Sequence, residues 1–102
     1  MKIIWTLPAI EELEGIRDYI AQDSAYYADN FVERAVEAVE SLARFPRIGR
    51  VVPEARRSDI REILFHAYRI IYQVAPDGLY IISVIHGSRD LKRKKPRPWD
   101  VT

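Results

Sequence analysis

The stretch from residue 60 to residue 86 constrains the fold most, because it alternates runs of β-branched and aromatic residues with turn residues. Runs of this composition and length are typical of strands. Between the second and third runs, Pro76, Asp77 and Gly78 favour a tight turn. The segment therefore predicts a three-stranded antiparallel meander with runs at residues 60–65, 68–74 and 79–86.

The two turns also predict a register, in which Phe65 faces Tyr68 and Val74 faces Leu79. Side chains alternate between the two faces of a strand, so one face is predicted to be the core. That face carries Ile63, Phe65, Tyr68, Ile70, Tyr72, Val74, Leu79, Ile81, Ser83 and Ile85. The opposite face carries Glu62, Leu64, Arg69, Ile71, Gln73, Tyr80, Ile82, Val84 and His86. This second face is apolar yet charged, and no element remains to cover it, so we interpret it as a groove that another molecule fills.

Upstream of the meander, the sequence predicts a short strand at residues 2–5 and two amphipathic helices. Thr6 and Pro8 are typical of a helix start, and Ser24 is a good N-cap for the second helix. The apolar stripes are Ala9, Leu13, Ile16 and Ile20 in the first helix and Ala28, Phe31, Ala35, Ala38, Leu42 and Phe45 in the second. Because the link is short, the helices should form an antiparallel hairpin over the core face, which gives an α+β fold.

Length and composition narrow the class of protein. A chain of 102 residues corresponds to one domain, which we place at residues 1–90, followed by a basic tail at 91–102 that we expect to be flexible on its own. The absence of cysteine excludes disulfide and thiolate chemistry and fits a cytoplasmic protein. Two histidines far apart in sequence argue against a metal site, no run is long enough to span a membrane, and no cofactor is expected.

The charge is divided along the chain. Residues 1–43 hold three basic and nine acidic side chains, whereas residues 44–102 hold thirteen basic and six acidic ones. A basic half favours an acidic partner or a phosphate backbone, although a merely solvated dipolar surface is the alternative.

Five short motifs carry a family resemblance that spans almost the whole chain. They are Phe45-Pro46-x-x-Gly49-Arg50, Pro53-Glu54, Ile60-Arg61-Glu62, Tyr68-Arg69-Ile70-Ile71-Tyr72 and Val84-Ile85-His86-Gly87. Each motif alone is weak, but their order and spacing together resemble the RelE/ParE superfamily of toxins. The Tyr-Arg-Ile-Ile-Tyr strand and the final Val-Ile-His-Gly are most similar to the ParE branch.

The resemblance implies a toxin of a type II toxin–antitoxin system, of the kind described as plasmid stabilisation proteins. A ParE-like member would arrest growth by poisoning DNA gyrase, with DNA contact through the gyrase complex. A cognate acidic antitoxin would neutralise it by forming a hetero-oligomer, and no interaction with a membrane is expected. We expect the antitoxin's C-terminal segment to bind the groove formed by Glu62, Leu64, Arg69, Ile71, Gln73, Tyr80, Ile82 and Val84.

The alternative implied by the resemblance is a RelE- or YoeB-like ribosome-dependent endoribonuclease that needs no metal. Glu54 would then be the base, Arg69 the cation at the phosphate, and His86 a further catalytic group. Gly87 and Ser88 stand where the YoeB-like pattern has histidine and tyrosine, so we expect no catalytic residues. Each candidate also has a structural interpretation: an Arg69–Glu62 ion pair, a solvated Glu54, and a His86 that only closes its strand. A toxin-fold domain without toxicity is a third hypothesis.

The C-terminal region supplies the predicted target-binding residues, which are His86, Arg89, Lys92, Arg93, Lys94, Lys95 and Trp99. A lysine-rich run is otherwise a solvated surface. Trp99 either packs back onto the sheet or anchors a partner, since aromatic side chains are frequent anchors.

Overall fold

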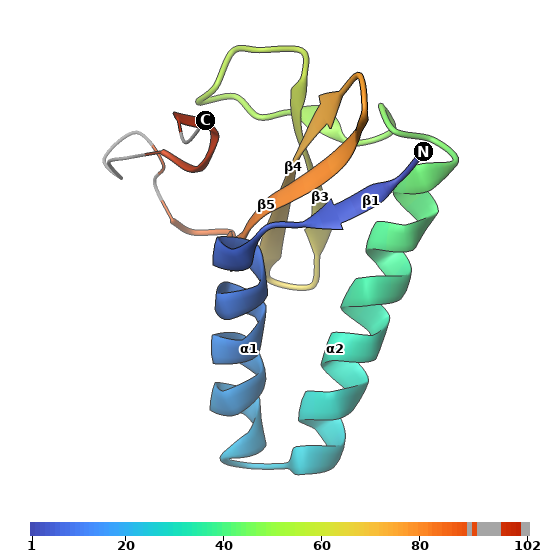
Figure 1. The fold of residues 1–102 in the computed structure, drawn as a ribbon. Coiled ribbons are helices and arrows are strands. Elements are labelled where there is room, and N and C mark those ends of the chain that lie inside the picture. Colours follow the sequence, from blue (N-terminus) through green and yellow to red (C-terminus); the bar gives the residue numbers. More distant parts are fainter. Residues whose placement is uncertain (90, 92–96, 101–102) are drawn as a thin grey trace.

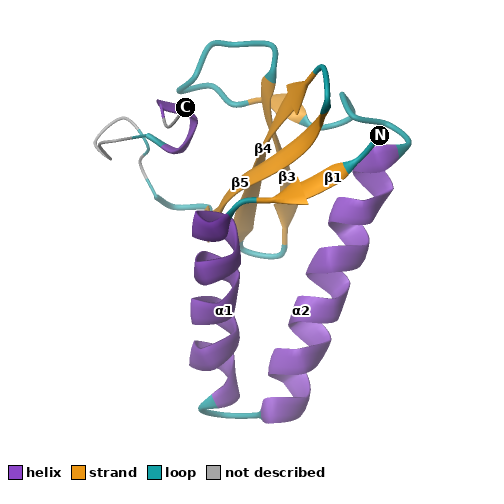
Figure 2. Cartoon of the chain, viewed as in Figure 1, coloured by secondary structure: helices purple, strands orange, loops and turns teal. Residues whose placement is uncertain are grey.

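The computed structural model describes residues 1–89, 91 and 97–100. In chain order its elements are β1 (Ile3–Trp5), α1 (Leu7–Ala21), α2 (Ala25–Glu40), η1 (Ser41–Ala43), β2 (Arg50–Val51), β3 (Ile60–Phe65), β4 (Tyr68–Ala75), β5 (Gly78–His86) and η2 (Pro98–Asp100). The two helices form a hairpin that extends beyond one end of the sheet (Figures 1 and 2). The architecture is α+β, as predicted.

Both helices begin at the predicted caps. The Thr6 hydroxyl accepts a hydrogen bond from the Ala9 amide at 3.4 Å, and the Ser24 hydroxyl accepts one from the Tyr27 amide at 3.2 Å. The second predicted stripe is wrong at its end: α2 stops at Glu40, Phe45 is 61% exposed, and Val39, outside the stripe, is buried. In the part of the chain that the structure describes, no helix has the length and apolarity needed to cross a membrane.

The sheet contains the predicted meander and more. Strands β3, β4 and β5 are antiparallel, with Phe65 opposite Tyr68 and Val74 opposite Leu79, as predicted. Two short strands extend this meander to the order β1-β5-β4-β3-β2. Because β1 runs parallel to β5, the sheet is mixed, and the prediction of a purely antiparallel three-stranded sheet was wrong in this respect. The parallel pairing joins residues more than 70 positions apart, which local sequence patterns do not encode.

A β-bulge changes the predicted faces at the end of β5. Tyr72 pairs with Ile81, but Ile71 pairs with Ser83, so Ile82 is an extra residue in β5. Every later residue of β5 is shifted by one position, and a shift of one residue exchanges the faces. Val84 therefore belongs to the core under the helices, and Ile85 belongs to the opposite side.

Two apolar clusters lie on the two faces of the sheet. The helix-side cluster consists of Ala9, Val39, Leu42, Ile70, Tyr72, Leu79, Ile81 and Val84. The second cluster consists of Val52, Ile60, Ile71, Ile85, Leu91 and Trp99. The prediction that no element of the chain covers the second face was wrong, because the loop after β2 and the C-terminal residues Leu91 and Trp99 pack on it.

Candidate functional site: a charge network beside a basic groove

Four charged side chains form one network on the second face of the sheet, which we call the charge network: Arg50, Glu54, Glu62 and Arg69. Both terminal nitrogens of Arg69 donate to the Glu54 carboxylate at 2.9 Å, and Arg69 Nε donates to Glu62 Oε1 at 2.6 Å. The second Glu62 oxygen accepts from Arg50 Nε at 2.5 Å. Two guanidinium groups and two carboxylates are thus paired within one chain.

Strand pairing and a turn bring these side chains together. Arg50 lies opposite Glu62 in the β2–β3 pair, and Arg69 lies on β4 on the same face as Glu62, as the register predicted. Glu54 follows β2 in a turn closed by the Ala55 and Arg56 amides, which donate to the Val52 carbonyl at 3.1 and 3.3 Å.

The centre of the network is buried, whereas the Arg50 side chain is 58% exposed. Glu62 is 1% exposed and Arg69 is 5% exposed. The hydrogen bonds from Arg69 lower the pKa of Glu54 from its usual 4.5 to about 2, against the opposing effect of burial. The hydrogen bonds to Glu54 in turn raise the pKa of Arg69 above its ordinary value, with Glu62 adding to the effect. Glu54 and Arg69 therefore both remain charged over the physiological pH range.

An open cavity of about 1120 Å³ lies beside the network, and we call it the basic groove. It is lined by Arg50, Pro53, Glu54, Ala55, Arg56, Leu64, His66, Ala67, Tyr68, Arg69, Gly87 and Arg97. Leu64 is 66% exposed there. Arg97 Nε is buried and has no hydrogen-bond partner among the described residues. The groove thus combines an exposed apolar side chain with guanidinium groups that can hold an anion.

The predicted antitoxin-groove residues divide between the groove and the protein interior. Leu64 and Arg69 line the basic groove, whereas Glu62 and Ile71 are buried beneath the loop after β2. Gln73 donates to Asp59 at 3.1 Å and the Tyr80 hydroxyl donates to Asp77 at 2.7 Å. Ile82 packs at the edge of the second cluster. The placement of Val84 on this face was wrong, because of the bulge.

The structure brings together two of the three nuclease candidates. Glu54 and Arg69 are in direct contact, but His86 pairs with Tyr68, and the two rings meet edge to face with their centroids 5.6 Å apart. His86 Nδ1 lies 2.7 Å from the Ser88 hydroxyl. The assignment of His86 to the groove face was wrong for the same reason as Val84. Glu54 is not a solvated loop acid, and the Arg69–Glu62 ion pair is confirmed.

The predicted target-binding residues have different outcomes. Trp99 is 7% exposed and packs in the second cluster, which resolves the alternative in favour of packing against the sheet. His86 and Arg89 are exposed, so target contact by them stays a prediction. Lys92, Arg93, Lys94 and Lys95 lie outside the described residues. The boundary at residue 90 also stays a prediction, although Leu91 and Trp99 are buried rather than free of the domain.

Sequence reasoning missed two arginines of the site. Arg50 closes the charge network, and its place in the Phe-Pro-x-x-Gly-Arg motif was a usable signal. Arg97 lies in a tail rich in basic residues, where the sequence contained no mark to distinguish it. Among the described residues, no group of histidine and acidic side chains is arranged to hold a metal ion.

Comparison with known proteins identifies the family. The sequence profile described as "ParE toxin of type II toxin-antitoxin system, parDE" matches residues 3–91. The chain belongs to the ParE toxin family. The predicted resemblance to the RelE/ParE superfamily is thereby confirmed, and this ParE-family chain is a toxin of the type II toxin–antitoxin class.

Relatives of this ParE-family toxin support the assignment. Toxin RelE2 of Caulobacter vibrioides is 34% identical over 89 residues, which are 86% of this chain and 97% of the relative. Putative toxin Y4kP of Sinorhizobium fredii is 34% identical over 87 residues, covering 83% and 86%. A solved structure of a chromosomal ParDE system from P. aeruginosa shares the fold with a TM-score of 0.71 at 21% identity, covering 84% of this chain and 95% of that one.

Proposed function

We propose that this ParE-family toxin arrests growth by binding DNA gyrase and stalling its cleaved-DNA complex, rather than by cutting RNA. The observation that carries the proposal is the closed pairing of Glu54 with Arg69. A general base works best with a pKa near the operating pH, and Glu54, at about 2, is a very weak base. Three of the five N–H donors of Arg69 bond to Glu54 and Glu62, so its charge is already paired with two carboxylates and is poorly placed to stabilise a phosphorane.

The position of His86 supports the same proposal. A nuclease would need an acid on the far side of the scissile phosphate from its base. His86 instead lies beside Tyr68 and Ser88 and does not line the basic groove. Loss of a positioned acid or base lowers a rate by roughly 10² to 10⁴-fold. We therefore expect negligible cleavage by this constellation.

We further propose that an acidic antitoxin neutralises this toxin through the basic groove, which would make a hetero-oligomer in the cytoplasm. The resemblance to a chain of a ParDE system supports a protein partner of this kind. In the groove, the guanidinium groups of Arg56 and Arg97 form no ion pair among the described residues, and Leu64 is an exposed apolar side chain of the same lining. An acidic segment with an apolar residue would complement this surface.

Two assays run on the same purified toxin test the mechanism. We expect gyrase-dependent DNA cleavage in the presence of wild-type toxin, and no codon-specific cleavage of ribosome-bound messages. Glu54→Gln serves as the matched variant, because it removes the proposed base; provided that it stays folded, it should give the same result as wild type in the RNA cleavage assay. Messages cut at defined codons, with cutting lost in Glu54→Gln while the fold is retained, would establish the nuclease alternative instead.

A further inference from the structure

A second surface of the molecule lies where α2 ends and the chain turns toward β2. We call it the Phe45 patch, consisting of Met1, Arg44, Phe45, Pro46, Arg47 and Ile48. Phe45 is 61% exposed, Ile48 69% and Met1 48%. Large apolar side chains exposed singly are ordinary, but three on one short turn and the adjacent terminus form a patch.

The patch is held rigidly, which argues against accidental exposure of a loose loop. The Ile48 amide donates to the Phe45 carbonyl at 3.1 Å, and the Met1 amino group donates to Ala43 at 3.0 Å. Arg61 Nη1 donates to the carbonyls of Arg47 and Gly49 at 3.1 and 2.9 Å. A side chain presented by a fixed backbone loses less entropy on binding.

Gly49 is the anchor of this turn. Its amide donates to the buried Tyr72 hydroxyl at 3.0 Å. A Cβ at this position would lie 2.5 Å from the Glu62 carbonyl oxygen and 2.6 Å from the Tyr72 hydroxyl, so only glycine fits. The close approach fixes the turn against the sheet next to the exposed Phe45 and Ile48.

The charge around the patch indicates the kind of partner. An open cavity of about 700 Å³ adjoins it, lined by Met1, Arg44, Phe45, Pro46, Arg47, Val74, Ala75 and Pro76. None of these lining residues is acidic, and Arg44 forms no ion pair among the described residues. A partner surface that pairs acidic side chains with an apolar recess would complement the patch in both charge and polarity.

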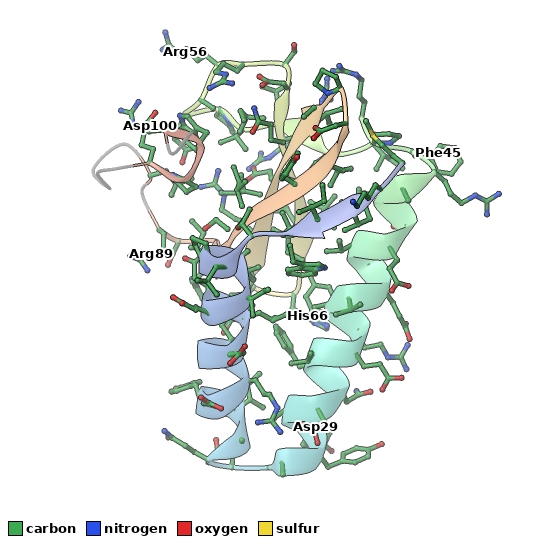
Figure 3. All side chains as sticks on the ribbon, viewed as in Figure 1. Asp29, Phe45, Arg56, His66, Arg89 and Asp100 are labelled. Atoms are coloured by element: carbon green, nitrogen blue, oxygen red, sulfur yellow. The ribbon has the colours of Figure 1, made fainter. Side chains whose placement is uncertain are left out.

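The Phe45 patch is separate from the basic groove. The two cavities have no lining residue in common. In Figure 3, Phe45 points outward at the opposite edge of the molecule from Arg56 and Asp100. Variants of the basic groove and variants of the Phe45 patch therefore change different residues, and their effects can be measured separately.

We propose that the Phe45 patch is the surface through which this toxin contacts its target protein, with Phe45 and Ile48 as anchors and Arg44 and Arg47 facing acidic residues of the target. The proposal rests on the proposed function, in that it takes the toxin to act by binding a protein. It assigns target contact to a surface distinct from the basic groove.

Two double variants and one control test the proposal. Phe45→Ala/Ile48→Ala removes the anchors, and Arg44→Ala/Arg47→Ala removes the charges. Tyr19→Ala/Tyr26→Ala is the control, because these aromatic side chains are 70% and 75% exposed at the far end of the helical hairpin. Growth arrest in cells, affinity for purified gyrase, affinity for the antitoxin, oligomeric state and thermal unfolding are measured for each.

We expect the anchor variant to lose growth arrest and to bind gyrase about tenfold or more weakly, with unchanged antitoxin binding and unfolding. The charge variant should lose less affinity and show a weaker dependence on salt. The control should behave as wild type. Full growth arrest in a folded anchor variant would overturn the proposal, as would a selective loss of antitoxin binding or a change in oligomeric state.

Failure of the proposed function would give a different result. If wild-type toxin arrests growth without binding gyrase, the proposal that gyrase is the target is wrong. Dependence of that arrest on Phe45 and Ile48 would still support the patch as the target surface, and independence from them would overturn it.

Discussion

The two faces of the sheet are buried in physically different ways. Under the helices, the buried cluster is apolar apart from the Tyr72 hydroxyl, which accepts a hydrogen bond from Gly49, and beside it the buried Ser83 hydroxyl donates to Glu12 of α1. On the other face, a smaller apolar cluster lies beside the charge network. Neighbouring residues of β4 show the contrast, since Ile70 and Ile71 are both fully buried but on opposite faces.

The difference separates two ways of holding a chain together. Burial of apolar area is non-directional, so the helix side tolerates changes that keep volume. The charge network is directional: Glu54 receives hydrogen bonds from Arg69 and from the Leu91 backbone, and so connects the loop after β2, strand β4 and the C-terminal segment. The second face therefore depends on three distant segments being present together.

The largest expected effect comes from removing the centre of the network. Arg69→Ala leaves Glu62 with only Arg50 and leaves Glu54 unpaired, and breaking a buried ion pair costs about 3 to 5 kcal/mol of unfolding free energy. Urea unfolding at pH 7 measures the loss. The matched variant on the other face is Ile70→Ala, for which a cavity costs about 2 to 5 kcal/mol.

The pH dependence then distinguishes the two faces. The loss of unfolding free energy in Arg69→Ala should become smaller as pH falls, because protonation removes the buried negative charge that the variant leaves without Arg69. The loss in Ile70→Ala should stay constant. Equal penalties at pH 7 and pH 4 for Arg69→Ala would show that the network acts only by packing.

Trp99→Ala tests whether the C-terminal segment is part of the second face. Loss of a buried aromatic side chain should lower the unfolding free energy by about 3 kcal/mol. Thermal or urea unfolding measures it, with the exposed Tyr26→Ala as control. A change in unfolding free energy below about 0.5 kcal/mol, as for ordinary surface substitutions, would contradict burial of Trp99 and favour the alternative that Trp99 anchors a partner.

Acid should weaken the second face through Glu54. Its pKa is lowered in the folded state, so its contribution is complete above the unfolded value of 4.5 and is lost as pH falls toward about 2. The expected loss is about 2 to 3 kcal/mol over that window. Glu54→Gln should start less stable at pH 6 and lack this component of the pH dependence. Parallel stability curves for the two proteins between pH 5 and pH 2 would refute the assignment.

The smallest effect is expected on the helical hairpin, where Arg17 donates to Asp29 at 2.7 Å with both side chains exposed. Exposed ion pairs contribute roughly 0 to 1 kcal/mol. Arg17→Ala should therefore change the unfolding free energy by less than about 1 kcal/mol, and 1 M salt should remove the difference. A loss comparable to that of Arg69→Ala would mean that burial does not explain the contrast between the two sites.

Several features of the fold follow from local sequence alone. The helix starts at Thr6 and Ser24 follow from side chains that cap the amide three residues ahead. The pairing of Val74 with Leu79 follows from the turn between them. The shared face of Glu62 and Arg69 follows from alternation along two strands joined by a two-residue turn. In each case the deciding residues are neighbours in the chain.

Tertiary structure alone decided the rest. The bulge at Ile82 lies just after the residues of β5 that pair with β1. Beyond it, the Ser83 hydroxyl and the Val84 amide donate to Glu12 of α1 at 2.9 and 3.2 Å. The partner of Arg69 was equally hidden, because Glu54 is fifteen residues away and reaches it only after the loop has folded onto the sheet. Trp99 is buried in a cluster that also contains Ile60 of β3, Ile71 of β4 and Ile85 of β5. Local periodicity predicts the face on which a side chain lies. The group that the side chain contacts on that face depends on which distant parts of the chain fold against it.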